Sequence, residues 1–386
     1  MDHPLMPWLV DAAVPGPEAL LAAIEAALGG TGPALAPTAG PPEPLPERVA
    51  EDTCLAIRTS GSTGSPRRVL LGAAALRASA HRTHERLGGA GRWVLALPLD
   101  HVAGLQVLVR SIVAGTDPLL SGGSPEALAA SVAAAAGTGP LYTALVPTQL
   151  HRIVRAATTS PDGALPPELT PLLRFDAILV GGSAASPALL EDARRLGLRV
   201  VTTYGMTETA GGCVYDGLPL DDVEVGLDDG VIRIAGPVLA SGYLVEGRLS
   251  TDGFERGADG ALWFRTADLG RLRGGRLEVV GRHDDVIVTG GVNVAPTAVE
   301  GALSGVPGVA EVCVVGVQDA EWGQRVTAVV VPGPGPAPTL AALREAVSRT
   351  LGSASAPRAL VLVDALPLRG PGKVDRAAVR RRAAGS

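Results

Sequence analysis

Short apolar runs alternate with helical patterns through the middle of the chain, and this alternation restricts the fold more than any other feature of the sequence. Short continuous apolar runs predict buried strands, and apolar residues three or four positions apart predict helices. Strands that alternate with such helices build an α/β fold with a largely parallel sheet. The predicted strands are Leu55–Arg58, Trp93–Leu97, Leu141–Val146, Ala177–Val180 and Arg199–Thr203, and the predicted helices are Ala103–Ala114, Pro125–Ala136, Thr148–Ala156 and Pro187–Leu196.

The pattern changes in the second half of the chain. From Val223 to Gly281 short strands follow one another and predict a compact β subdomain, and a mixed α+β pattern begins afterwards. We place a domain boundary near Arg282–Asp285, so residues 1–282 form a large N-terminal α/β domain and residues 283–386 a small α+β domain. The predicted strands here are Val231–Ile234, Ala261–Phe264, Arg276–Val280, Val309–Val317 and Val326–Val331, and the predicted helices are Pro296–Leu303 and Leu340–Leu351.

Charge and cysteine content exclude several classes of protein. The 386-residue chain has 33 Lys+Arg and 39 Asp+Glu, a formal net charge of −6 at pH 7, which argues against nucleic acid as a partner. Cys54, Cys213 and Cys313 lie far apart, so the sequence indicates neither a disulfide scaffold nor a zinc cluster.

Two segments bear on location. Met1–Val10 contains no lysine or arginine, which argues against a secretory signal. Ala127–Leu150 is uncharged, but Gly137-Thr138-Gly139-Pro140 interrupts it, so it reads as a helix, a turn and a buried strand. We therefore expect a cytoplasmic protein without stable membrane insertion.

The segment Thr31–Pro46 is rich in Pro, Ala and Gly, which predicts a linker or a surface loop.

Lys373 is the only lysine of the chain, and Asn293 is the only asparagine. The composition favours arginine wherever any positive charge is sufficient. The lysine at this position is retained either because a compact ammonium group on a flexible side chain is needed there or by chance. The composition alone is compatible with both explanations.

A Ser/Thr/Gly-rich loop follows the first predicted strand of the α/β region. Its glycines allow tight turns, and its hydroxyl and N–H groups suit phosphate oxygens. It is not a Walker A loop, because the Gly-Lys-Ser/Thr end is missing. By itself the loop fits a flexible polar turn equally well. It comprises Thr59, Ser60, Gly61, Ser62, Thr63 and Gly64.

Two more polar loops follow predicted strands. Thr203-Tyr204-Gly205-Met206-Thr207-Glu208 offers a ring that can stack on a base, hydroxyl groups for a phosphate and a carboxylate for Mg²⁺. Gly181-Gly182-Ser183 permits close approach of a flat ligand to the backbone. Ligands of open α/β sheets bind beyond the carboxyl ends of the strands, where these loops fall, although each alone could be an ordinary turn.

Taken in order, these motifs resemble those of the adenylate-forming superfamily, which contains acyl-CoA synthetases, peptide-synthetase adenylation domains and luciferases. The resemblance extends from Leu55 to Arg376, and several motifs in the family's order are far more specific than one. Departures are Arg67, where the family usually has lysine, Ala267, where glycine is common, and a short N-terminal domain. The further matching segments are Thr266–Gly270, Gly281–Asp285, Gly290–Pro296, Val299-Glu300 and Pro367–Arg376.

The resemblance implies ATP and CoA as co-substrates, Mg²⁺ as cofactor and a role for each matching residue. Lys373, Thr207 and Glu208 would be catalytic, with Glu208 also the metal ligand, and the small C-terminal domain would move about Asp284 and Asp285. The implied ATP-binding residues are Thr59, Ser60, Gly61, Ser62, Thr63, Gly64, Gly181, Gly182, Ser183, Thr203, Tyr204, Gly205, Thr207, Asp268 and Arg282.

The segment His101–Ser111 and the glycines that follow Thr209 resemble one branch of the superfamily, the ligases that join o-succinylbenzoate to CoA in menaquinone biosynthesis. The resemblance implies that His101, Gln106, Arg110, Gly211 and Gly212 bind the acid, with Arg110 near its aromatic carboxylate. A packed loop histidine and a helix-surface arginine are the alternatives for His101 and Arg110.

The sequence is compatible with three other functions. The chain could activate another aryl or short-chain acid, or it could bind nucleotides without catalysis, although Glu208, Asp268 and Lys373 argue against the latter. A P-loop NTPase is disfavoured by the missing Walker lysine. The sequence leaves open whether the chain forms a homodimer.

Overall fold

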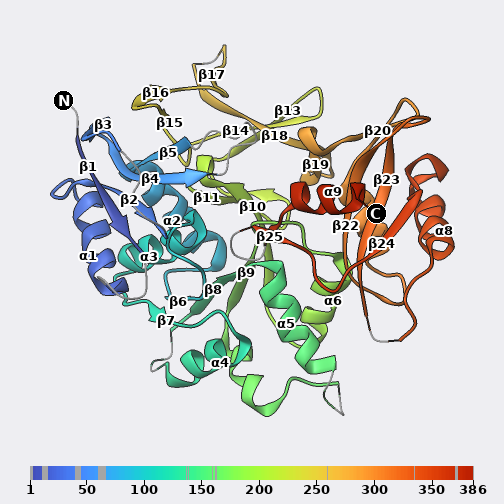
Figure 1. Cartoon of the computed structure of the whole chain (residues 1–386). Helices are drawn as coiled ribbons and strands as arrows, with labels where there is room; N and C mark the ends of the chain where they lie inside the picture. Colours follow the sequence, from blue (N-terminus) through green and yellow to red (C-terminus); the bar gives the residue numbers. More distant parts are fainter. Residues whose placement is uncertain are drawn as a thin grey trace. The chain divides into compact units, whose positions relative to one another are not determined.

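The computed structural model describes residues 3–10, 16–39, 45–59, 67–135, 137, 139–158, 160, 163–258, 260–333, 335–369 and 373–385, with Thr158, Arg369 and Lys373 described by their backbone only. The chain forms two compact units (Figure 1). Unit 1 contains Met1–Gly182, Ala193–Gly226 and Arg233–Thr266, and unit 2 contains Ser183–Asp192, Leu227–Ile232 and Ala267–Ser386.

The first sheet of unit 1 has the strand order β16-β15-β5-β4-β2-β1-β3. Every residue of β2 is buried, as a strand in the middle of a covered sheet requires. The strands are β1 (His3–Leu9), β2 (Ala34–Thr38), β3 (Arg48–Val49), β4 (Thr53–Thr59), β5 (Arg67–Gly72), β15 (Gly242–Val245) and β16 (Arg248–Ser250).

The second sheet of unit 1 has the order β12-β11-β10-β9-β8-β6-β7, and it is parallel from β7 to β10. Its central strands β8 and β9 are apolar and buried on both faces, the usual pattern for a parallel sheet covered by helices. The strands are β6 (Arg92–Leu95), β7 (Leu119–Leu120), β8 (Leu141–Leu145), β9 (Ala177–Val180), β10 (Val200–Met206), β11 (Gly211–Tyr215) and β12 (Leu218–Pro219).

Helices connect the two sheets of unit 1. Helix α1 contacts the first sheet through β2 and β4, α2 contacts β5 and β11, and α3 contacts β6, β8, β11 and the other two helices. Helix α4 contacts β6 and packs with α5 (Figure 1). The helices of unit 1 are α1 (Pro17–Leu28), α2 (Ala73–Leu87), α3 (Val102–Ala114), α4 (Pro125–Ala134) and α5 (Pro147–Thr158), with a 3-10 helix at Pro167–Arg174. Most of helix α6 (Pro187–Arg195) belongs to unit 2.

The β subdomain contains long hairpins. Strand β18 pairs first with β17, where Phe254 lies opposite Phe264, and then with β19, where Asp268 lies opposite Arg282. The strands are β13 (Glu224–Asp228), β14 (Val231–Ala235), β17 (Phe254–Arg256), β18 (Leu262–Arg273) and β19 (Arg276–Arg282).

The C-terminal part of unit 2 is a sheet of order β21-β20-β23-β22, with β24 beside β23 and a helix layer on each face. Alternate residues of β22 pack against helices on opposite faces of the sheet. Val314 packs with α7 and α8, whereas Cys313 and Val315 pack with α9. The elements are β20 (Ile287–Thr289), β21 (Val292–Val294), α7 (Pro296–Leu303), β22 (Val309–Asp319), β23 (Gly323–Pro332), α8 (Leu340–Leu351), β24 (Ala359–Leu362), the hairpin β25 (Leu368–Arg369) and β26 (Lys373–Val374), and α9 (Arg376–Ala384).

The predicted fold class is confirmed, since the chain has a large α/β part, a β subdomain and a smaller α+β part. The uncharged segment Ala127–Leu150 contains the end of α4, β8 and the start of α5, so its predicted helix and buried strand are confirmed, whereas its predicted turn falls partly outside the described residues. In the described residues, no helix is both long and apolar enough to cross a membrane.

The prediction of a linker at Thr31–Pro46 is wrong for part of that segment. Its residues Ala34–Thr38 form β2, which pairs with β1 and β4 inside the first sheet. Two prolines, Pro33 and Pro37, interrupt the apolar run in the sequence, and Pro37 is accommodated because the register pair that joins β2 to β4 is Leu35 with Leu55, away from Pro37.

Candidate active site

The carboxyl ends of β9 and β10 lie close together in unit 1 because small residues permit it. A Cβ atom added to Gly181 would lie 2.3 Å from Thr203 Oγ1, and Thr203 Oγ1 donates a hydrogen bond to the Val180 carbonyl oxygen at 3.5 Å. Gly212 on β11 also faces Thr203, with its added Cβ 3.2 Å from Thr203 Cβ. The structure therefore brings together predicted residues of the nucleotide and acid sites, Gly181, Thr203 and Gly212.

The loop that carries Glu208 begins with a bulge in β10. The register with β11 shifts between Tyr204 and Gly205, and a Cβ atom on Gly205 would lie 2.1 Å from the Gly211 carbonyl oxygen. Thr209 Oγ1 accepts a hydrogen bond from the Met206 N–H at 2.9 Å, which closes the 3-10 turn over Thr207–Thr209. Local backbone geometry thus turns the chain directly after Tyr204 and buries the Glu208 side chain.

Glu208 is 7% exposed and has two partners from the first sheet. Tyr243 donates its hydroxyl hydrogen bond to Glu208 Oε1 at 2.9 Å, and Arg67 Nη2 lies 3.9 Å from the same oxygen. The Arg67 guanidinium also stacks on the Tyr243 ring, 4.0 Å from its centroid. Burial and the Glu208 carboxylate raise the pKa of Tyr243, so its hydroxyl stays protonated as the donor.

This arrangement suits a magnesium ion that arrives with a phosphate ligand. Among the described residues, no group of three or more His, Cys, Asp or Glu side chains could hold a metal. Magnesium commonly keeps several waters and takes one or two protein carboxylates together with substrate phosphates. A single buried carboxylate, Glu208, meets that requirement.

Helix α3 presents Gln106 and Arg110, one turn apart, toward β11. Gln106 is fully buried and donates through Nε2 to the Ala210 carbonyl oxygen at 2.7 Å, which also accepts a bond from Ser79 Oγ at 3.0 Å. Ala210 has a φ of 49°, in the left-handed region that non-glycine residues rarely adopt. The two bonds hold this strained residue between Glu208 and the Gly211–Gly212 pair.

Arg110 is 3% exposed, so the alternative of a helix-surface arginine is wrong. Its Cζ lies 4.7 Å from the centroid of the Trp93 ring, and its Nη2 donates to the Tyr215 hydroxyl at 3.4 Å. Thr83 donates its own hydrogen to the Ser79 carbonyl, so Tyr215 is the donor in its 2.9 Å bond with Thr83. Arg110 therefore begins a directed hydrogen-bond chain through Tyr215 and Thr83.

The charge of Arg110 has no anionic partner in the part of the chain that the structure describes. Its Nε–H group also lacks an acceptor there, and burial lowers the pKa of the guanidinium from its ordinary value. A buried charge without a counter-ion costs free energy. The position is therefore suited to an anion supplied by a ligand.

His101 is the residue before α3, and its carbonyl oxygen accepts bonds from the Gly104 and Leu105 N–H groups. Its side chain is 42% exposed and lies 3.7 Å from Asp100, so the alternative of a packed loop histidine does not describe it.

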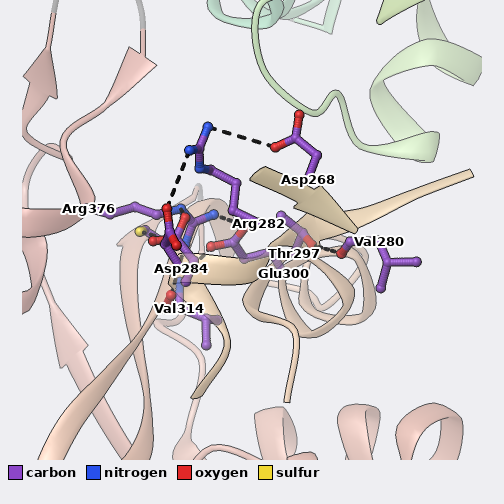
Figure 2. A network of polar contacts seen from close by, with 10 residues as sticks. Asp268, Val280, Arg282, Asp284, Thr297, Glu300, Val314 and Arg376 are labelled. Atoms are coloured by element: carbon purple, nitrogen blue, oxygen red, sulfur yellow. Dashed lines mark hydrogen bonds and ion pairs between the residues drawn. The ribbon is translucent and has the colours of Figure 1, made fainter. Parts of the chain in front are cut away.

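The predicted ribose and hinge residues lie together in unit 2, as Figure 2 shows. Arg282 Nη1 is 3.8 Å from Asp268 Oδ1, and Arg282 Nη2 is 3.7 Å from Asp284 Oδ2. Asp284 and Asp285 belong to a 3-10 turn over His283–Asp285, directly after β19. Arginine thus links the predicted ribose carboxylate to the predicted hinge.

The remaining predicted residues are described less completely. Ser60, Gly61, Ser62, Thr63 and Gly64 lie outside the described residues, and Thr59 ends β4. Gly182 and Ser183 are exposed after β9. The backbone of Lys373 belongs to β26, opposite Arg369, and its side chain lies outside the description.

Tyr243, Ser79, Thr83, His84 and Trp93 were not identified from the sequence. Their sequence neighbours carry no motif, and their role depends on packing between elements. Rarity was one usable signal: the chain has only four tyrosines, and three of them, Tyr204, Tyr215 and Tyr243, lie in this region.

Residues 9–270 match the family model of the AMP-binding enzymes, and residues 298–373 match the model of the AMP-binding enzyme C-terminal domain. The chain is 45% identical over 380 residues to a probable 2-succinylbenzoate–CoA ligase of Mycobacterium tuberculosis (strain CDC 1551 / Oshkosh), covering 95% of each protein.

More distant relatives carry the same description. A 2-succinylbenzoate–CoA ligase of Escherichia coli (strain K12) is 31% identical over 288 residues, which are 72% of this chain and 58% of that protein. Among solved structures, o-succinylbenzoate CoA synthetase (MenE) of Bacillus subtilis in complex with the acyl-adenylate intermediate OSB-AMP is similar, with a TM-score of 0.71 and 26% identity. That match covers 94% of this chain and 80% of the other.

Proposed function

The chain belongs to the AMP-binding enzyme family, and from this premise we propose that it is an AMP-forming acid–thiol ligase that joins o-succinylbenzoate to CoA. Its products are o-succinylbenzoyl-CoA, AMP and pyrophosphate. The observation that carries the proposal is the buried Glu208 carboxylate beside the glycine-lined ends of β9 and β10, in a chain whose relatives are named for this reaction.

The proposed reaction has two steps, and each step forms one bond and breaks another. In the first, an oxygen of the acid's succinyl carboxylate attacks the α-phosphorus of ATP, an acyl–phosphate bond forms, and the bond to pyrophosphate breaks. In the second, the CoA sulfur attacks the acyl carbon, a thioester forms, AMP leaves, and the thiol proton passes to solvent. Both steps bring anions together, so each needs positive charge or hydrogen-bond donors near the reacting oxygens.

We assign ATP binding to the strand ends. Tyr204 would stack on adenine, Asp268 would accept bonds from the ribose hydroxyls, and Arg282 would hold Asp268 in place, as its 3.8 Å contact suggests. The phosphates would meet hydroxyl and N–H groups of the loop after β4 and of Thr203 and Thr207. The proposed loop residues are Thr59, Ser60, Gly61, Ser62, Thr63 and Gly64, with Gly181, Gly182, Ser183 and Gly205 shaping the base site.

Glu208 would hold the magnesium ion that accompanies ATP. When bound, that ion neutralises charge on the phosphates and on the leaving pyrophosphate. Tyr243 orients the carboxylate through the 2.9 Å bond, and Arg67 supplies positive charge to the same oxygen.

Lys373 is the proposed catalytic cation. Its ammonium group would offset the negative charge that develops as the carboxylate attacks the α-phosphate. The planar guanidinium group of arginine is wider than the ammonium group of lysine and is held less flexibly. This difference would account for a lysine at this single position of an otherwise lysine-free chain.

Arg110 is the residue that we propose for substrate choice. A buried guanidinium without an anionic partner among the described residues fits an acid with a second carboxylate, which o-succinylbenzoate has. The Tyr215 hydroxyl already donates its proton to Thr83, so we propose that Arg110 reaches this carboxylate directly or through a water molecule. His101, Gln106, Gly211 and Gly212 would form the surrounding wall.

We further propose that residues 1–282 and 283–386 are the two functional domains and that they rotate about Asp284–Asp285 between the two half-reactions. Such hinge motions commonly couple successive steps of one reaction. We place the reaction in the cytoplasm, where ATP and CoA are available.

The test is pyrophosphate release with ATP, Mg²⁺ and o-succinylbenzoate, with and without CoA. We expect release by the wild type, a CoA thioester when CoA is present, and a rate at least about a hundredfold lower for Lys373→Ala. Arg380→Ala, a change at an exposed position of α9, is the matched control and should leave the rate unchanged.

Other outcomes decide between the alternatives. Turnover with other aryl or short-chain acids but none with o-succinylbenzoate would move the chain to another acyl-CoA synthetase. No pyrophosphate with any acid, together with retained ATP binding, would identify a non-catalytic relative.

A further inference from the structure

Arg376 makes polar contacts with several elements of unit 2 (Figure 2). It is the first residue of α9, and its side chain is 24% exposed. Its Nη2 lies 2.7 Å from Glu300 Oε2 on α7, its Nε lies 3.7 Å from Asp285 Oδ2, and its Nη1 donates to the Val314 carbonyl oxygen at 2.9 Å. One side chain thus joins α7, α9, β22 and the turn after β19.

Part of this network is explained by the fold alone. Strand β22 is at the edge of its sheet, so Val314 has a free N–H and a free carbonyl group. Glu300 Oε1 accepts from the Val314 N–H at 2.8 Å, and Arg376 donates to the Val314 carbonyl. The Glu300–Arg376 pair therefore covers the edge of β22, and this structural role does not require Asp285.

The Asp285 contact needs a separate explanation. Asp284 and Asp285 are neighbours, yet their carboxylates meet different arginines: Asp284 meets Arg282 on β19, and Asp285 meets Arg376. The turn is thereby connected in one direction to the hairpin that carries Asp268 and in the other to the start of α9.

Arg376 is also close in sequence to Lys373. Three residues of chain span at most about 10 Å, so fixing Arg376 restricts where the strand that carries Lys373 can go. The Asp375 N–H donates to the Pro367 carbonyl oxygen at 2.8 Å and closes the base of the β25–β26 hairpin. Arg376 and Asp375 together hold the chain directly after β26 in place.

We propose that Arg376 is a positioning residue, and that its ion pair with Asp285 sets the placement of the Lys373 hairpin for adenylation. This inference rests on the proposed function, because it takes Lys373 as the catalytic cation. The charge of Arg376 is secure: burial opposes it, but the Glu300 carboxylate and then Asp285 raise its pKa above the ordinary value.

The experiment compares Asp285→Asn, Arg376→Lys and the double variant with the wild type. Asp285→Asn removes one charge and leaves the Glu300–Arg376–Val314 contacts in place. Adenylation is measured as ATP–pyrophosphate exchange with o-succinylbenzoate, and thioester formation is measured from supplied acyl-adenylate and CoA. Thermal melting reports on folding.

For Asp285→Asn we expect adenylation to fall by roughly tenfold or more, since a displacement near 1 Å in an active site can cost about a hundredfold. The KM for ATP, thioester formation and the melting temperature should stay close to wild-type values. Asp285→Glu should restore much of the adenylation rate. In the Arg376→Lys background, Asp285→Asn should add little, because the two residues act through one contact.

The matched control is Arg271→Gln, which removes an exposed arginine–carboxylate pair with Glu278 on the β18–β19 hairpin and should change neither half-reaction. Unchanged adenylation in Asp285→Asn would overturn the inference. So would an equal loss of both half-reactions with a lower melting temperature, or additive losses in the double variant.

Failure of the proposed function gives a different result. In that case the wild type itself would show no pyrophosphate exchange with o-succinylbenzoate or any other acid, and the inference about Arg376 would fall with it. Normal wild-type activity with unaffected variants would remove only the inference.

Discussion

At the scale of single residues, two buried charged side chains of unit 1, Glu208 and Arg110, have different surroundings. Glu208 has a hydrogen-bond donor and a cation beside it, Tyr243 and Arg67, so its carboxylate is compensated by the protein itself. Arg110 is also buried, but in the described residues its guanidinium stacks on the Trp93 ring and donates to the Tyr215 hydroxyl, and neither partner is an anion. Such asymmetry is common at functional sites, where the missing partner is the ligand.

His84 beside this arginine gives a prediction about pH. Its Nε2 accepts a hydrogen bond from Trp93 Nε1 at 3.0 Å, so the folded protein needs the neutral ring. Burial, followed by the charges of Arg110 and His81, lowers the pKa of His84 from 6.5 to about 4. The folded state therefore resists protonation, and the free energy of unfolding should fall as pH decreases from about 6.5 to about 4.

The matching variant is His84→Gln, which keeps an acceptor for Trp93 but has no charge to gain. The difference in the free energy of unfolding between wild type and variant should shrink by roughly 2–3 kcal/mol over that pH range. Urea denaturation at pH 7 and pH 4.5 measures it. Parallel stability curves for the two proteins would contradict the assignment.

At the scale of elements, two glycines within helices differ in how closely other backbone atoms approach them. Gly104 lies in the first turn of α3, where an added Cβ would be 2.1 Å from the Pro98 carbonyl oxygen. Gly301 lies in α7, where nothing lies within 4 Å of an added Cβ. The two positions have the same residue and the same secondary structure but opposite surroundings.

Replacing each glycine by alanine should therefore change stability in opposite directions. Gly301→Ala should stabilise the protein by about 1 kcal/mol, the usual helix preference of alanine over glycine. Gly104→Ala should destabilise it by about 2 kcal/mol or more, since the Pro98 backbone has to move. Chemical denaturation of both variants checks this, and stabilisation by Gly104→Ala would contradict the geometry.

At the scale of the whole molecule, ligand binding should be visible in the unfolding of the chain. A stable analogue of the acyl-adenylate binds only the folded protein, so an excess should raise the melting temperature. At about 100 times its dissociation constant, the gain is about 2.7 kcal/mol, or roughly 3 °C for a protein of this size.

The same shift is expected for Lys373→Ala, because the proposed role of Lys373 is in the transition state. Differential scanning fluorimetry with and without the analogue tests both proteins. A shift lost in the variant would mean that Lys373 binds the ground state, and the catalytic assignment would need revision.

The strand and helix pattern of the chain was predictable from sequence wherever apolar periodicity was strong. The predicted strand Ala177–Val180 and helices Pro296–Leu303 and Leu340–Leu351 match the structure. Strand β2 was missed because its prolines and small residues resemble a linker, and only pairing with β1 and β4 makes it a strand. Local sequence does not contain that long-range information.

For the site, the sequence by itself supplied the proposed functional residues that belong to local motifs: Tyr204, Glu208, Asp268 and the lone Lys373. Only the tertiary structure decided that Arg110 is buried and that Tyr243 and Arg67 meet Glu208. Motifs follow the chain, whereas burial and ion pairing depend on elements brought together from distant positions, so contacts such as Arg376 with Asp285 become visible only after folding.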